Sequence, residues 1–207
     1  LAAGNPLHDV LAMLVRGIEE LEPRMTASLL LLDGPGKRFV RCIAPSMPDE
    51  FSRAIEGVEV GPVAGSCGTA AFRREPVFVA DIATDPLWVA YKHLVAPHGL
   101  LACWSSPITA TDGRVLGTFA VYYRVSRLPE SEERELIARA THVAGIAIER
   151  RQLDDQLRAL SARIEAVREQ DRTAIAREIH DELGQALTAL KMDVAWVQRR
   201  LPTPEPQ

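Results

Sequence analysis

The sequence predicts an α+β fold in which an antiparallel sheet with flanking helices is followed by one long C-terminal helix. Every aromatic residue except Trp196, and nearly every glycine, lies before about residue 150. Up to about residue 130, short β-prone runs alternate with Gly, Pro and Asp, the pattern of strands joined by turns. From Glu132 to Leu201 there is no proline, and good helix formers dominate. The chain therefore divides into a globular part and a helical part.

The first elements follow from local signals. Asn5-Pro6 opens an amphipathic helix that ends at Pro23. Two β-prone runs come next and are joined by a Gly- and Pro-containing turn, so they predict a hairpin. The expected elements in this part are strands at Ala27–Leu32 and Lys37–Ile43, a short helix over residues 49–56, and a glycine-lined turn at Gly65–Phe72 that leads into a helix.

The second half of the globular part follows in the same way. Val77–Ala80 reads as a buried strand. Thr84-Asp85-Pro86 supplies an N-cap and an N1 proline for a helix through about Val95. Two long strands, at Leu100–Ile108 and Val115–Tyr123, complete the sheet. The acidic residues from Glu130 to Glu133 mark the start of the last helix.

The overall composition narrows the function classes. The formal charge of −4, the pI of about 5.8 and the lack of a Lys/Arg block argue against a nucleic-acid surface. No apolar run approaches the roughly 20 residues that cross a bilayer, and no leader pattern is present, so we expect a cytoplasmic protein. The three cysteines, Cys42, Cys67 and Cys103, are expected to be reduced thiols.

The helical part carries a coiled-coil pattern. If continuous, about 70 residues of helix would extend over roughly 105 Å and would have to bury their apolar stripe against a partner. The stripe steps by four and three through Leu153, Leu157, Leu160, Ile164 and Val167, which is the 3.5-residue period of a left-handed coiled coil. It resumes after Ile175 with a mean spacing near 3.6, which suits a helix bundle. We therefore expect a parallel homodimer through this helix.

His180 is the candidate reactive residue of the helical part. It follows the stripe residue Ile179, about 100° round the helix, so it can face solvent beside the stripe. An imidazole that attacks a phosphoryl group needs one neutral nitrogen, and a neighbouring carboxylate such as Asp181 can hold or deprotonate the other. Gln185 lies one turn beyond Asp181, where an amide could position a water molecule. Gly184 leaves room for an approaching domain.

The run from Arg172 to Gln185, which contains Glu178-Ile179-His180-Asp181-Glu182-Leu183-Gly184-Gln185, resembles the H-box of HisKA_3-type sensor histidine kinases. Their partners are often DNA-binding response regulators. The resemblance implies that His180 accepts the phosphoryl group, that Asp181 is the base, and that Asp181 with Gln185 forms the phosphatase motif. It implies ATP and Mg as cofactors of the full-length kinase only. Because no ATP-binding domain follows Pro206 in the printed chain, we expect the chain alone to be inactive.

The globular part resembles the GAF family from about Leu7 to Gln152, best over Gly65–Phe72, Pro76–Ile82 and Gly117–Ala120. The expected organisation is a GAF sensor domain at 1–152, a coiled-coil signalling helix at 153–170, and a truncated phosphotransfer helix at 171–207. In GAF domains a small molecule lies between the sheet and the helices above it. By resemblance the candidate ligand-binding residues are Asp81, Trp88, Tyr91, His93, His98, Cys103 and Ser105, with Trp104 in the same segment.

The identity of the ligand stays open. The only asparagine is Asn5, so the N-K-F-D-E signature of cyclic-nucleotide GAF domains is missing, and no Cys-His dipeptide exists to hold a bilin. No metal site is predicted, although His93, His98 or Cys103 could ligate a metal or haem. Alternatively, both tryptophans of the segment are core and both histidines are surface residues.

Two other functions compete with the kinase. Gly65-Ser66-Cys67-Gly68 is similar to the cysteine-bearing turn of GAF-fold free-methionine sulfoxide reductases, in which case Cys103 is a possible resolving thiol. The third possibility is a GAF sensor dimer with another output.

Overall fold

The computed structural model describes residues 6–200 and divides the chain into two compact units. The first unit continues through Leu153, and the second begins at Asp154. The predicted end of the helix at the prolines from Pro202 onward lies outside the described residues.

The first unit is built on a five-stranded sheet with the order β2-β1-β5-β4-β3. All neighbouring strands are antiparallel, so the predicted α+β fold with an antiparallel sheet is confirmed. The strands are β1 (Thr26–Leu32), β2 (Phe39–Ile43), β3 (Val77–Val79), β4 (Ala102–Thr109) and β5 (Val115–Tyr123).

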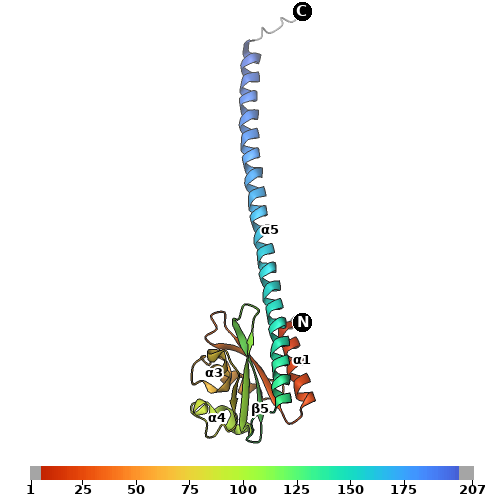
Figure 1. Ribbon diagram of the computed structural model, residues 1–207. Helices are drawn as coiled ribbons and strands as arrows, with labels where there is room; N and C mark the ends of the chain where they lie inside the picture. The colour runs from red at the N-terminus through yellow and green to blue at the C-terminus, as the bar shows by residue number, and fades with distance from the viewer. Residues whose placement is uncertain (1–5, 201–207) are drawn as a thin grey trace, which may run out of the picture. The chain divides into compact units, whose positions relative to one another are not determined.

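Helices cover both faces of this sheet (Figure 1). One face packs against α1 (Pro6–Leu21) and the first turns of α5 (Ser131–Arg200), a continuous helix of 70 residues. The other face packs against α2 (Asp49–Ile55), α3 (Gly65–Arg73) and α4 (Lys92–Val95).

The single helix predicted through about Val95 is wrong, because this segment forms two short helices separated by a turn. Its start follows the expectation: the side chain of Asp85 accepts a hydrogen bond from Leu87 N at 2.8 Å and caps the 3₁₀ helix η1 (Pro86–Trp88). α4 follows after a turn, and a second 3₁₀ helix, η2 (Ala96–His98), contains Pro97. Gly99 then ends the segment at a φ of 66°, a left-handed conformation that favours glycine.

Two glycines permit close packing around the sheet. A Cβ on Gly117 of β5 would lie 2.1 Å from the backbone oxygen of Leu30, so only glycine fits beside β1 here. A Cβ on Gly145 would lie 2.9 Å from the backbone oxygen of Thr109 at the end of β4. Gly145 therefore lets the backbone of α5 approach the sheet more closely than any other residue would allow.

The second unit consists of the rest of α5. Its apolar stripe is exposed in the single chain, with 61% of Leu157, 55% of Leu160 and 45% of Ile164 accessible to solvent. Monomeric proteins rarely leave so long an apolar surface uncovered.

Candidate functional site

A small cavity lies in the first unit between the sheet, α3 and α4. It leaves about 30 Å³ open to the centre of a water-sized molecule, which is room for about two water molecules. Its lining is mostly apolar: Leu30, Phe39, Ile55, Val58, Ala64, Gly65, Leu94 and Val95. The groups with polar atoms in the lining are Ser66, Cys67, Trp88, Tyr91 and Tyr122.

Below the cavity, α3 meets the sheet through a set of buried polar side chains that we call the thiol cluster. The members are Ser28, Ser66, Cys67, Trp88, Cys103, Ser105, Thr118 and Tyr122. Alternation along β4 and β5 places every second residue on this face, which is why Cys103 and Ser105, or Thr118 and Tyr122, lie together.

Hydrogen bonds fix the start of α3 onto β4. The Ser66 hydroxyl donates to the backbone oxygen of Cys103 at 3.1 Å and accepts from the Trp88 indole nitrogen at 3.0 Å. The Tyr122 hydroxyl lies 4.0 Å from the Cys67 sulfur and 3.3 Å from the Ser28 hydroxyl. The indole of η1, the first turn of α3 and the three strands β1, β4 and β5 are therefore joined in one buried network.

The pKa values of the ionisable groups in the cluster are shifted in opposite directions. A hydrogen bond with Cys103 lowers the pKa of Cys67, against the effect of burial, and the hydroxyls of Ser105, Thr118 and Tyr122 lower it further. Burial raises the pKa of Cys103 and of Tyr122 well above their ordinary values. Cys67 is therefore the first of these groups to ionise.

The structure separates the predicted ligand-binding residues into two groups. Trp88 and Tyr91 line the cavity, and Cys103 and Ser105 lie in the thiol cluster beneath it. Trp104 is buried on the other face of the sheet, among the residues that pack against α1 and α5.

Three of the predicted ligand-binding residues lie neither at the cavity nor in the thiol cluster. Asp81 stabilises its own turn, where its carboxylate accepts hydrogen bonds from Ala83 N and the Thr84 hydroxyl. His93 is exposed, and His98 contacts the Phe51 ring edge-on. Among residues 6–200, apart from the few side chains that the structure leaves out, no three His, Cys, Asp or Glu side chains are grouped to hold a metal ion.

Sequence reasoning missed four cluster members, which are Ser28, Ser66, Thr118 and Tyr122. Tyr122 and Tyr123 are adjacent, so alternation predicts opposite faces for them, but the sequence does not say which face carries the cavity. Ser66 could have been found from its position at the glycine turn that opens α3, beside Cys67.

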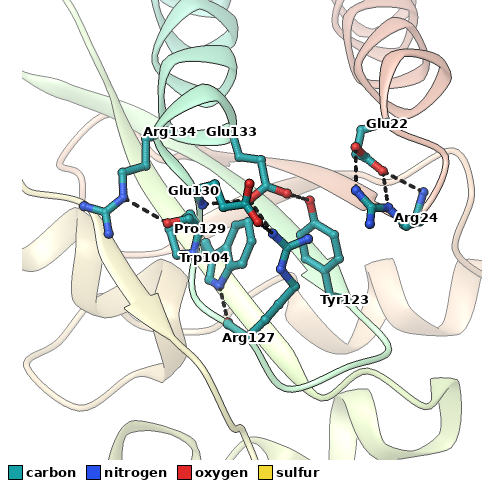
Figure 2. Close-up of polar contacts among 9 residues, drawn as sticks. All are labelled: Glu22, Arg24, Trp104, Tyr123, Arg127, Pro129, Glu130, Glu133 and Arg134. Atoms are coloured by element: carbon teal, nitrogen blue, oxygen red, sulfur yellow. Dashed lines mark hydrogen bonds and ion pairs between the residues drawn. The ribbon is translucent and has the colours of Figure 1, made fainter.

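The first turn of α5 is held to the opposite face of the sheet by a polar cluster (Figure 2). The Glu133 carboxylate accepts hydrogen bonds at 2.8 Å from the Tyr123 hydroxyl, from the Arg127 guanidinium and from Glu130 N. The guanidinium of Arg127 stacks over the rings of Trp104 and Tyr123, at 5.4 and 4.9 Å from their centroids. The Trp104 indole donates to the backbone oxygen of Arg127 at 3.1 Å.

The candidate phosphoacceptor lies in the second unit. His180 and Gln185 are exposed on α5, and the neighbouring Ile179 has 51% of its surface accessible. The side chain of Asp181 lies outside the described residues. A Cβ on Gly184 would meet open space, so packing against the described residues does not require glycine there.

Comparison with known families identifies both parts of the chain. Residues 4–149 match the GAF domain family, and residues 171–207 match the histidine kinase family. The chain therefore belongs to the GAF domain family, and its two matches together are those of a GAF-domain sensor histidine kinase. No helix among the described residues is long and apolar enough to cross a membrane.

Individual proteins resemble this chain in sequence or in fold. The methyl sulfide methyltransferase-associated sensor of Methanosarcina acetivorans is 37% identical over 81% of this chain. The matched region covers only 17% of the length of that relative. A domain of a protein named as a two-component sensor histidine kinase from Sinorhizobium meliloti 1021 superposes with a TM-score of 0.60, at 22% identity, over 75% of this chain and 99% of that domain.

A reductase also has this fold. The type II free methionine-R-sulfoxide reductase from Thermoplasma acidophilum superposes with a TM-score of 0.52, at 12% identity, over 70% of this chain and 93% of the reductase. At this identity the similarity concerns the fold alone.

Proposed function

We propose that this chain is the sensor and phosphoacceptor portion of a cytoplasmic two-component kinase in which His180 receives a phosphoryl group. In the full-length protein the donor would be ATP with Mg, and the acceptor of the second transfer would be an aspartate of a response regulator. The observation that carries the proposal is the exposed His180 imidazole on a continuous helix, inside the segment that matches the histidine kinase family. An exposed imidazole can be reached by a catalytic domain without unfolding the helix.

The neighbours of His180 suit both transfer steps. Asp181 would hold one imidazole nitrogen and keep the other available for attack. Gln185 would direct water at the phosphorylated regulator. A glycine in an exposed helix interior costs about 1 kcal/mol relative to alanine. Because none of the described residues occupies the space at Gly184, we attribute this glycine to the approach of another domain.

The working form would be a parallel homodimer through α5. The exposed stripe from Leu153 to Val167 has the coiled-coil period, and pairing with a second copy would remove this surface from water. Beyond Ile175 the stripe continues with more than half of Ile179, Leu183 and Leu190 exposed, which suits a helix bundle around the phosphoacceptor.

Control by a small ligand would begin at the cavity. Cys103 and Tyr122 belong to the thiol cluster, whereas the next residues, Trp104 and Tyr123, contact the cluster at the start of α5. A ligand that moves β4 or β5 on one face would move the first turn of α5 on the other. The long helix would then shift between two states that differ in access to His180. The bound molecule is unknown.

The test is phosphorylation of the full-length kinase with ATP and Mg. We expect one acid-labile label in the wild type and none in His180→Gln. His142→Gln is the matched control, because His142 is also exposed on α5, and it should label normally. Label that survives in His180→Gln would refute the assignment.

A further inference from the structure

The buried thiols of the first unit are a pair that kinase chemistry does not use. Cys67 on α3 and Cys103 on β4 are 8% and 0% exposed, and both belong to the same buried cluster between α3 and the sheet. The Ser66 hydroxyl also holds the backbone of Cys103, which fixes α3 against β4 at this point. The third thiol, Cys42, lies on β2 and has its pKa raised to about 12 by burial.

Two hydroxyls beside this pair lack partners. Ser105 Oγ and Thr118 Oγ1 are buried, and neither makes a hydrogen bond in the reduced protein. Leaving a buried donor unsatisfied costs free energy. Both hydroxyls nonetheless lie close enough to the Cys67 sulfur to lower its pKa. A negative charge on that sulfur would attract both hydroxyl donors and offset the free-energy cost of burying them.

The cavity gives a small molecule access to Cys67. This residue lines the cavity, whose free space of about 30 Å³ suits a molecule little larger than water. The remaining lining is largely apolar, so the space selects a small uncharged reactant rather than an anion. Hydrogen peroxide has this size and charge.

We propose that Cys67 is a peroxide-reactive thiol and that Cys103 resolves its oxidation product into a disulfide. The Cys67 thiolate attacks one peroxide oxygen, the O–O bond breaks, and hydroxide leaves, giving a sulfenic acid on Cys67. The Cys103 sulfur then attacks the Cys67 sulfur, an S–S bond replaces the S–O bond, and the thiol proton leaves with the hydroxyl as water. The two thiols lose two electrons, and peroxide is reduced to water.

The disulfide would tie the first turn of α3 covalently to β4. Ser66 lies next to Cys67 and accepts a hydrogen bond from Trp88, so the lining of the cavity would change with the redox state. Any effect of this change on His180 rests on the proposed kinase function, whereas the thiol chemistry does not.

The experiment treats the folded chain with hydrogen peroxide, blocks the remaining thiols by alkylation after unfolding, and maps the cysteines by mass spectrometry. We expect a Cys67–Cys103 disulfide in the wild type and an alkylated Cys42. Cys103→Ser should accumulate a sulfenic acid on Cys67 that a cyclic dione traps. Cys67→Ser should lose the reaction, and Cys42→Ser should keep it. Oxidation that begins at Cys42 or Cys103, or three thiols left intact, would overturn the proposal.

A pH profile separates an activated thiol from one that is merely accessible. The titratable groups around Cys67 are Cys103 on β4, Tyr122 on β5 and Cys42 on β2, and their pKa values are all raised. The peroxide rate should therefore rise with a midpoint below that of an ordinary thiol. Thr118→Val keeps the shape of the side chain but removes one hydroxyl, so it should move this midpoint to higher pH and slow the reaction at neutral pH. An unchanged rate in this variant would contradict the role of the buried hydroxyls. Because thiols are counted directly, a negative result leaves the kinase assignment untouched.

Discussion

Replacement of Glu133 by Gln tests what holds the start of α5 to the sheet. The Glu133 side chain is 11% exposed and its Arg127 partner is 19% exposed, so their 2.8 Å ion pair is largely removed from water. The amide keeps the size of the side chain but loses the charge and turns one acceptor oxygen into a donor. Either the Tyr123 hydroxyl or the Arg127 and Glu130 donors then lose their acceptor.

The magnitude follows from these contacts. A hydrogen bond to a charged group contributes about 1.5–3 kcal/mol, and breaking a fully buried ion pair costs about 3–5 kcal/mol. Arg127 is partly exposed and has a second carboxylate, Glu130, at 3.3 Å, which keeps some of its stabilisation. We therefore expect Glu133→Gln to lower the free energy of unfolding of the first unit by about 2 kcal/mol.

The same helix provides a matched control. Glu135 pairs with Arg139 at 2.7 Å, but the two side chains are 65% and 71% exposed. Exposed pairs of this kind contribute about 0.3–0.5 kcal/mol, so Glu135→Gln should change stability little. Urea unfolding followed by tryptophan fluorescence measures both variants, because Trp104 lies under Arg127. Equal losses in the two variants, or a loss below about 0.5 kcal/mol in Glu133→Gln, would refute the reasoning.

Two further predictions concern the rest of α5. Leu157→Asp with Ile164→Asp should convert the dimer to monomers in light scattering, because the stripe cannot bury two carboxylates, whereas Ala162→Asp on the outer face should not; a double variant that stays dimeric excludes this interface. Gln185→Ala in the full-length kinase should leave autophosphorylation within a few-fold while slowing dephosphorylation of the regulator, and Asp181→Ala should lower both by about 10²–10⁴-fold. Equal losses in Gln185→Ala would indicate damaged helix packing instead.

The strands were predictable because their signals are local. β1, β4 and β5 are runs of apolar and β-branched residues bounded by Gly, Pro or Asp, and their predicted bounds agree with the structure within two residues. The helix expected through Val95 begins at the predicted cap, Asp85, but it is shorter than predicted because packing set its length. Trp88 turns inward to bond Ser66, and this contact across the fold is invisible in the sequence.

Which residues of the 81–105 segment lie at the cavity or in the thiol cluster was only partly predictable, for a similar reason. Residue type identified Trp88, Tyr91, Cys103 and Ser105, because groups able to stack or hydrogen-bond are concentrated there. It also selected Asp81, whose carboxylate caps a turn, and His93, which faces solvent. Aspartate supplies turn caps as readily as ligand contacts, so composition alone cannot separate the two roles.

Side chains in β4 and β5 alternate between the two faces of the sheet. This alternation explains why the sequence alone did not identify the face with the cavity, and it couples the two faces of the sheet. Consecutive residues face opposite sides of the sheet, so Cys103 and Tyr122 face α3 while Trp104 and Tyr123 face α5. Cys103 and Tyr122 are also direct partners across the two strands. Any change that pulls Cys103 toward α3 therefore acts on the backbone that positions Trp104, Arg127 and the first turn of α5. Gly145 brings the same helix against the end of β4. A displacement of β4 would therefore act on α5 at two places, its first turn and Gly145.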